Sequence, residues 1–226
     1  MRNLGRWLLL LAMICFSAPS YAGEGRAWNG PYIGLLAGWG SIDNRFTHSD
    51  GNPPPFSIDA DGGFGGIFSG YNWRSGNTVL GIESDTSLTG MSGEWGAMTD
   101  HTADIRWLST FRGRVGLLVN PSTLVYATGG LAIARVRFEH VGHHSWDDTF
   151  FGWTLGGGIE RVLFGNIKGA IEGLYMDFSE ETSPGHLHGN GASCAVGTPR
   201  CHAMSNAPDG FVVRAKLSIP LGDLLK

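Results

Sequence analysis

The chain has 226 residues, of which 42% are hydrophobic and 11% aromatic, and its formal charge at neutral pH is −4. It contains 36 glycines without the three-residue period of collagen, and its many aromatic residues exclude a disordered chain. The negative charge argues against nucleic acid as a partner.

The first 22 residues predict a cleaved secretory signal peptide. Two arginines give a positive start, an apolar stretch follows over residues 7–16, and small residues occupy the cleavage positions. This stretch is too short to span a bilayer as a helix, which disfavours an uncleaved anchor. We expect residues 1–22 to be removed and residues 23–226 to form one barrel domain whose formal charge is −6 after the loss of Arg2 and Arg6.

The rest of the chain predicts strands. Apolar and polar residues alternate with period two, and glycine and turn residues separate the alternating stretches. No stretch has the pattern of a stable amphipathic helix. We predict eight strands, in chain order, at residues 31–40, 62–73, 78–90, 105–119, 123–138, 151–163, 168–178 and 210–221.

The connections between these strands alternate strictly between short and long. Three are tight turns, at residues 74–77, 120–122 and 164–167. Four are longer and polar, at residues 41–61, 91–104, 139–150 and 179–209. All short turns therefore lie at one end of the strands. This sorting is typical of a bacterial outer-membrane barrel and is not expected of a soluble β-sandwich. The sequence predicts an all-β, eight-stranded, antiparallel, transmembrane up-and-down barrel with both termini in the periplasm.

Aromatic residues fall near both ends of the predicted strands, as expected for two membrane interfaces. The periplasmic set is Trp28, Tyr71 and Trp73, and the extracellular set is Trp39, Trp107, Trp153 and Tyr175. The rims of a soluble sandwich would also suit these residues, so the two belts support the barrel only together with the signal peptide and the loop lengths.

Alternation assigns one face of each strand to lipid and the other to the barrel interior. The interior set then contains four acids and four bases: Glu83, Asp85, Glu160, Glu172, Arg112, Arg114, Arg214 and Lys216. A cation on the lipid face would cost about 2–4 kcal/mol at mid-membrane, whereas pairing inside offsets its desolvation. Leu36 and Phe68 also point inward, and an eight-stranded barrel is just wide enough for side chains to fill. The network can be a plug or a selectivity filter, and we favour the plug.

The same strands resemble the small outer-membrane beta-barrel family of Gram-negative bacteria, which includes opacity-type, porin-like, outer membrane immunogenic and haemin-binding barrels. The similar segments are "WNGPYIGLLAGWG" (28–40), "GGFGGIFSGYNWRSGNTVLGIESD" (62–85), "FRGRVGLL" (111–118), "LVYATGGLAIARV" (124–136), "GWTLGGGIE" (152–160) and "IEGLYMDF" (171–178). The resemblance implies location in the outer membrane, outer-membrane lipid and the assembly machinery as partners, and no catalytic residues. Family chains usually end on an aromatic residue, whereas here Ile219 stands in that place and "PLGDLLK" follows.

All eight histidines fall in the long connections: His48, His101, His140, His143, His144, His186, His188 and His202. Clusters of neutral imidazole can bind a metal ion or haemin at the cell surface, and His140, His143, His144, His186 and His188 are the candidates. The alternative, which we favour, is that histidine is simply tolerated in loops.

Two cysteines remain after cleavage, Cys194 and Cys201. In an exported chain they predict a loop disulfide, because a metal pair would have a spacing such as C-x-x-C.

An enzyme is disfavoured. His144, Ser145 and Asp147 are close in sequence, but adjacency does not create the hydrogen-bonded geometry of a nucleophile, and no G-x-S-x-G motif occurs. We expect a monomeric surface protein with no cofactor and a structural, envelope or surface-contact role. The alternatives are a small-solute porin or a receptor for haemin, metal or a host surface ligand.

Overall fold

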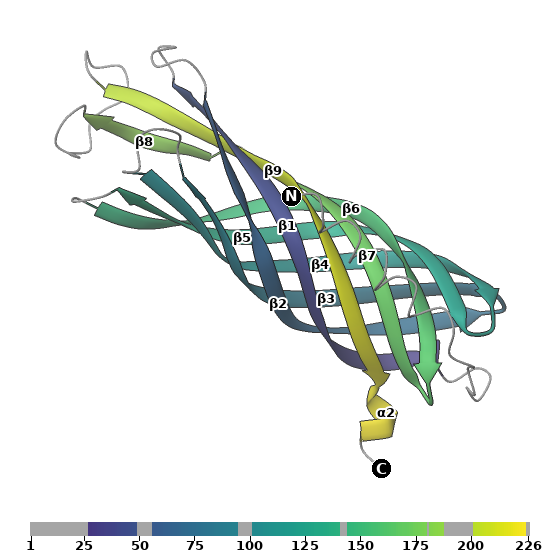
Figure 1. Cartoon of the computed structure of the whole chain (residues 1–226). Helices are drawn as coiled ribbons and strands as arrows, with labels where there is room; N and C mark the ends of the chain where they lie inside the picture. The colour runs from purple at the N-terminus through teal and green to yellow at the C-terminus, as the bar shows by residue number, and fades with distance from the viewer. Residues whose placement is uncertain are drawn as a thin grey trace, which may run out of the picture.

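The computed structural model describes residues 27–48, 56–94, 101–140, 144–179, 181–187 and 201–224. Within these ranges the chain forms nine strands and one short helix, which lies at the end of the last strand (Figure 1). Their bounds are β1 (Gly30–His48), β2 (Phe56–Ser75), β3 (Thr78–Glu94), β4 (His101–Asn120), β5 (Thr123–His140), β6 (His144–Phe164), β7 (Ile167–Phe178), β8 (Glu181–Leu187), β9 (Cys201–Pro220) and α2 (Leu221–Leu224).

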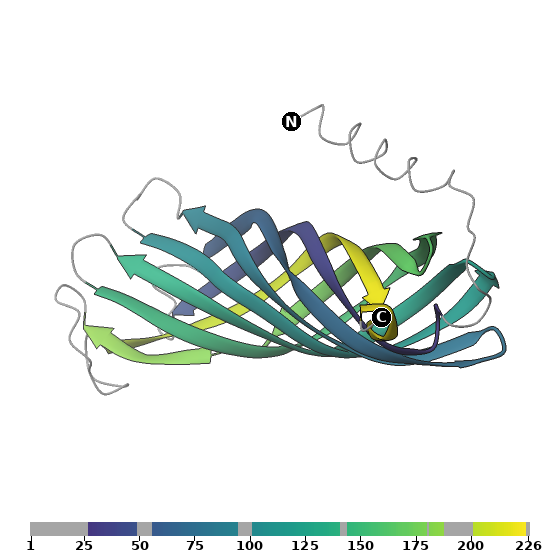
Figure 2. The ribbon, with the colours of Figure 1, turned by 90° about the horizontal axis from the view of Figure 1, so that it is seen from below.

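Eight of the strands close into an antiparallel barrel. Strands β1 to β7 pair in chain order, β7 pairs with β9, and β9 pairs with β1 to complete the ring. The strands are tilted relative to the barrel axis (Figure 2). The predicted eight-stranded barrel is confirmed. The ninth strand, β8, pairs only with β9, and the sequence did not predict it.

The strands are longer than predicted at the end that carries the long connections. β1 continues to His48 opposite Met204, and β9 begins at Cys201 rather than at residue 210. These extensions lack a clean apolar alternation, but their backbone N–H and C=O groups still pair across the ladder. Periodicity therefore marked only the part of each strand with an apolar outer face.

The tight turns lie together at the opposite end of the barrel, near α2 (Figure 1). Gly76 and Gly165 have φ angles of 60° and 57°, a conformation that glycine adopts at no steric cost. The backbone N–H of Leu118 donates to the carbonyl of Asn77, and that of Val162 donates to the carbonyl of Ser122. These two bonds tie each turn to its neighbour.

The outer surface is apolar between two levels of aromatic residues. Leu35, Leu88 and Leu155 are 65%, 75% and 59% exposed. Large apolar side chains exposed in a continuous band are typical of a surface that faces lipid. The aromatic side chains Trp39, Tyr71, Trp73, Trp153 and Tyr175 are exposed on this surface, and Trp107 is half-buried there. Among the described residues, no helix is both long enough and apolar enough to cross a membrane.

The prediction that Trp28 belongs to the outer belt is wrong. Its side chain is 1% exposed and lies inside the barrel mouth, where Nε1–H donates to the carbonyl of Pro121 at 3.0 Å. Trp28 precedes β1, and Gly30 at the start of that strand has a φ of 103°. Trp28 has the same parity as the inward-facing Tyr32 and Leu36, so alternation alone would have placed it inside, and its assignment to the outer belt rested only on its position at a strand end.

Glycine on the inner face makes room for bulky side chains from the opposite strand. A Cβ on Gly70 would collide with the hydroxyl of Tyr32 and with the carbonyl of Ile82, whereas a Cβ on Gly113 meets nothing closer than 4.0 Å. We expect Gly70→Val to destabilise the barrel by about 1–3 kcal/mol through overpacking, and the matched outer-face change Gly113→Val to have little effect. Urea unfolding in lipid vesicles, followed by tryptophan fluorescence, measures both. Equal losses would contradict a filled space beside Gly70.

Candidate functional site in the barrel interior

The barrel interior contains all eight charged residues that alternation assigns to it. Residues two apart in a strand share a face, so β3, β4 and β9 each contribute two charges, while β6 and β7 contribute one each. Every one of these residues is at most 5% exposed: Glu83, Asp85, Arg112, Arg114, Glu160, Glu172, Arg214 and Lys216. The register places Glu83 opposite Arg112 and Glu172 opposite Arg214.

Arg112 lies at the centre of the network. Its Nη2 is 2.6 Å from Glu83 Oε1 and 2.9 Å from Asp85 Oδ2, and its Nη1 is 3.1 Å from Glu172 Oε1. Its Nε donates to Thr110 Oγ1 at 2.8 Å. The planar fork of one guanidinium thus holds three carboxylates from two strands, β3 and β7.

The two cations of β9 bridge the same carboxylates from the other side. Arg214 Nη2 lies 2.6 Å from Glu172 Oε1 and 3.1 Å from Asp85 Oδ2. Lys216 Nζ lies 2.5 Å from Glu83 Oε1 and 3.5 Å from Glu172 Oε2. Charges from β3, β4, β7 and β9 are therefore joined across the interior.

A second group forms around Glu160, nearer the tight turns. Arg114 Nη2 lies 2.5 Å from Glu160 Oε2, and Lys168 Nζ lies 3.0 Å from Glu160 Oε1. Arg114 Nη1 is also 3.5 Å from Glu83 Oε2, which links the two groups. Lys168 was missed by the sequence analysis, although it shares the inward parity of Glu172 in β7 and is 1% exposed.

Two tyrosines, also missed, add hydrogen bonds to the carboxylates of the network. Tyr32 donates its hydroxyl to Glu83 Oε2 at 3.0 Å, and Tyr126 donates its hydroxyl to Glu172 Oε2 at 2.7 Å. The Arg114 guanidinium lies over the Tyr126 ring at 4.2 Å. A tyrosine in an apolar strand is usually interpreted as a membrane-interface residue. Only the parity that Tyr32 shares with Leu36, and Tyr126 with Leu124, indicates that both face the interior.

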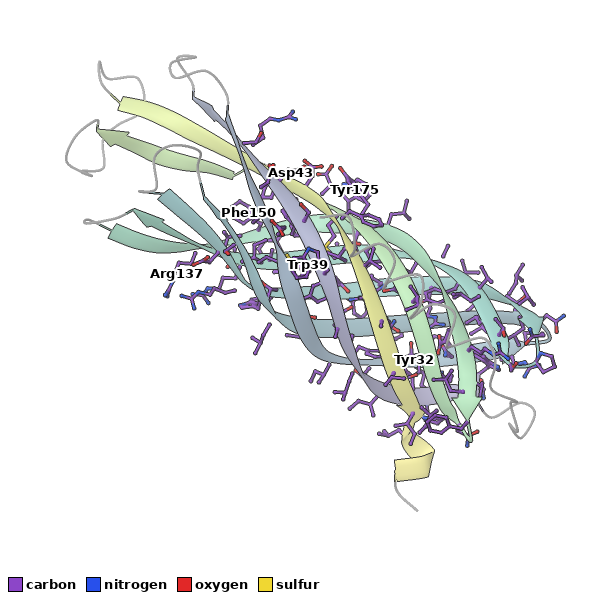
Figure 3. All side chains as sticks on the ribbon, viewed as in Figure 1. Tyr32, Trp39, Asp43, Arg137, Phe150 and Tyr175 are labelled. Atoms are coloured by element: carbon purple, nitrogen blue, oxygen red, sulfur yellow. The ribbon has the colours of Figure 1, made fainter. Side chains whose placement is uncertain are left out.

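Apolar side chains lie on both sides of the charged layer. At the mouth near the tight turns, Trp28 packs with a small cluster: Ala27, Val79, Leu118, Leu124, Tyr126 and Val162. Beyond the charges, a larger cluster includes Ile42, Phe64, Met91, Phe150 and Met176. Phe150 is 1% exposed, and Figure 3 labels it toward the end of the barrel that carries the long connections. The interior therefore has an apolar, a charged and a second apolar layer.

What the charged layer can do chemically follows from its pairing. Removing either partner of a buried ion pair leaves an uncompensated charge, which is costly, so the layer fixes strand positions. Among the described residues, no group of three or more His, Cys, Asp or Glu side chains could hold a metal ion.

The predicted loop sites fall outside the described side chains. His143, His188 and Cys194 lie outside the described residues, and only the backbones of the other histidines and of Cys201 are described. The ladder places His101 opposite His140, and His140 opposite His144. The disulfide between Cys194 and Cys201 stays a prediction.

Comparison with known proteins finds the same kind of molecule. The profile described as outer membrane protein beta-barrel domain matches residues 8–197. The 31 kDa outer-membrane immunogenic protein of Brucella melitensis is 36% identical over 174 residues, which cover 68% of this chain and 72% of that protein. The 22 kDa outer membrane protein of Rhizobium leguminosarum is 38% identical over 122 residues, covering 53% and 54%.

Two solved structures are similar at low sequence identity and low TM-score. Ail, the attachment invasion locus protein of Yersinia pestis, is 10% identical with a TM-score of 0.38, covering 82% of this chain and 99% of that chain. The outer membrane protease OmpT of Escherichia coli is 10% identical with a TM-score of 0.40, covering 84% and 96%.

Loss of the central guanidinium tests the charged layer. We expect Arg112→Met to destabilise the barrel by about 3 kcal/mol, the low end for a broken buried pair, because Glu83, Asp85 and Glu172 each keep another cation. The matched change Arg74→Met, whose Nε donates only to the Gly76 carbonyl at an exposed turn, should stay within about 0.5 kcal/mol. Urea unfolding in lipid vesicles compares the two, and similar losses would show that the network does not hold the interior.

Proposed function

Because the chain belongs to the outer membrane protein beta-barrel family and resides in the outer membrane, we propose that it is a non-conducting surface protein. Its interior is filled by side chains, and its role is structural in the envelope or one of surface contact. The observation that carries this proposal is the buried charge network, in which nine ionic side chains from five strands pair across the interior.

The layers on either side of the network support a closed interior. A solute or ion would have to pass Trp28 and its neighbours, then the paired charges, then the cluster around Phe150 and Met176. Apolar constrictions exclude water and so oppose conduction. An eight-stranded ring is narrow enough for side chains to occupy its whole width.

The glycines of the inner face give independent support. A Cβ on Gly34 would collide with the ring of Phe68, one on Gly38 with the ring of Phe64, and one on Gly158 would lie 2.9 Å from the hydroxyl of Tyr126. The opposing rings occupy the space that those Cβ atoms would need. At these three positions the space beside the inner face is already occupied, which supports a filled interior.

Planar-bilayer recording tests the closed interior. We expect the purified protein to give no stable unit conductance, because in the proposed closed interior the paired charges and apolar layers block the passage of water and ions. A conducting porin reconstituted in the same bilayers is the positive control. Reproducible unit steps from this protein would overturn the proposal and favour a small-solute porin.

A second candidate function is capture of a metal ion or haemin at the cell surface. The observation that favours it is the register of His101, His140 and His144 in three neighbouring strands. Neighbouring strands lie about 4.8 Å apart, a spacing that lets imidazoles on adjacent strands reach one metal ion.

Titration separates this candidate from the first. If these histidines bind, a variant with His101, His140 and His144 changed to alanine should lose at least tenfold in affinity for Zn²⁺ or haemin. A variant with His48 and His202 changed to alanine is the control. Unchanged affinity in the triple variant would end this candidate.

The remaining expectations follow from the family. We propose a monomer whose partners are outer-membrane lipid and the assembly machinery, and no catalytic role. The relatives reported above are named as an outer-membrane immunogenic protein and an outer membrane protein, and neither name is that of an enzyme.

A further inference from the structure

The charges of the barrel interior do not balance. Among the described residues, the buried charged side chains are four carboxylates and five cations: Glu83, Asp85, Glu160, Glu172, Arg112, Arg114, Lys168, Arg214 and Lys216. An unmatched charge in a low-dielectric interior is costly, so buried charges are normally compensated by a partner of opposite sign. The surplus positive charge therefore calls for a counter-charge that the described side chains do not supply.

The ion pairs locate this surplus. The group around Arg112 contains three carboxylates and three cations and is neutral. The Glu160 group, which consists of Glu160, Arg114 and Lys168, contains one carboxylate between two cations, with Arg114 Nη2 at 2.5 Å and Lys168 Nζ at 3.0 Å. Arg114 also lies 3.5 Å from Glu83, but that carboxylate already contacts cations of the first group. The net positive charge therefore belongs to the Glu160 group, at the end with the tight turns.

Arg114 also has a hydrogen-bond donor to spare. Its Nε is buried and has no hydrogen-bond partner within the part of the chain that the structure describes. Arg112, by contrast, donates from all three of its guanidinium nitrogens. Because a buried donor without a partner costs its full desolvation penalty, Arg114 Nε marks a place where an acceptor would be favourable.

The other buried side-chain atom without a hydrogen-bond partner in the described ranges is Asn72 Oδ1, and it lies close to Arg114. A Cβ on Gly81 would be 2.4 Å from Asn72 Oδ1 and 3.1 Å from Arg114 Cγ, so the two side chains meet over Gly81. Rotation of the amide by 180° exchanges its oxygen for its NH2 group. Asn72 can therefore present a second donor beside Arg114 Nε.

Lys168 is held as a cation by its surroundings. Besides its ion pair with Glu160, Nζ lies 4.7 Å from the centroid of the Tyr32 ring and 5.2 Å from that of Trp28. Tyr32 is labelled in Figure 3 near the end of the barrel that carries α2. The negative faces of the rings favour an ammonium group but carry no net charge. These contacts stabilise the charge of Lys168 without cancelling the surplus.

We propose that the Glu160 group binds one small monovalent inorganic anion, such as chloride, at Arg114 Nε. The anion accepts a hydrogen bond from Nε, and its single charge neutralises the interior. A small ion suits the place, because Tyr126 packs against the Arg114 guanidinium and Trp28 against Lys168. The site needs no path through the barrel, so anion binding and the absence of unit conductance are independent results.

The anion reaches the site from the mouth that Trp28 closes. Trp28 precedes β1, and its Nε1–H donates to Pro121, in the turn between β4 and β5 across the ring. Gly30, which follows, has a φ of 103°, and a Cβ there would meet nothing within 4 Å. Because glycine adopts many backbone conformations, Trp28 can move aside at Gly30 without displacing a strand.

Unfolding in lipid vesicles tests the site, with chloride replaced stepwise by the bulky anion gluconate at constant ionic strength, so that screening does not change. We expect the equilibrium constant of unfolding to fall about tenfold for each tenfold rise in chloride above its dissociation constant, because an ion that binds only the folded barrel stabilises it by mass action. Bromide should act like chloride. Unfolding that is independent of chloride would overturn the proposal.

Charge variants locate the effect. Lys168→Gln removes the surplus charge and leaves Glu160 paired with Arg114, so the dependence on chloride should disappear. The matched control is Arg74→Gln, which removes a cation at an exposed turn of the same end and should keep the full dependence. Heat-modifiable gel mobility checks the folding of each variant. Persistence of the dependence in Lys168→Gln, or its loss in Arg74→Gln, would overturn the site.

A measurement on the unaltered protein decides the matter if Lys168→Gln does not fold. Crystals of the full mature chain grown in bromide should show an anomalous scattering peak beside Arg114 Nε. Bromide bound only on the outer surface, or nowhere, would overturn the proposal.

Discussion

A sheet inside a bilayer must satisfy every backbone N–H and C=O within the protein, because no water is present to bond them. Pairing of β1 with β9 meets this constraint by removing both edges of the sheet. Closure at eight strands then sets a narrow interior, and period-two alternation fills it with every second side chain. The apolar exterior, the buried charges and the aromatic levels all depend on that closure.

Alternation was enough to predict the barrel and the inward direction of its charges, because one face of each strand must suit hydrocarbon. It failed where that condition does not hold. The polar extensions of β1 and β9 continue beyond the apolar part of the barrel. Trp28 was misplaced for another reason: it has the inward parity of Tyr32, but its position at a strand end favoured an interface residue. At Arg106 a bulge reverses the parity of β4, and a one-residue irregularity leaves no mark in an alternating pattern.

The interior also contains residues whose inward position the sequence analysis did not predict. Lys168 stands at the start of β7 and pairs with Glu160, yet a lysine near a turn reads as a surface residue. From sequence alone, Tyr32 and Tyr126 resemble membrane-interface aromatics. The structure shows that their hydroxyls donate hydrogen bonds to Glu83 and Glu172. Which inward groups meet depends on the tilt and stagger of the strands, and one sequence does not reveal those quantities.

The last strand, β9, determines the charge balance of the barrel interior. β9 brings Arg214 and Lys216 to carboxylates of β3 that are 129 and 133 residues earlier in the chain. Before β9 docks, the four acids Glu83, Asp85, Glu160 and Glu172 face only Arg112, Arg114 and Lys168, so the unfinished ring holds an excess carboxylate. Docking converts that deficit into a surplus of one cation. Closure of the barrel and neutralisation of its carboxylates are therefore a single event. A ring that lacks β9 keeps one buried carboxylate without a matching cation, which destabilises it.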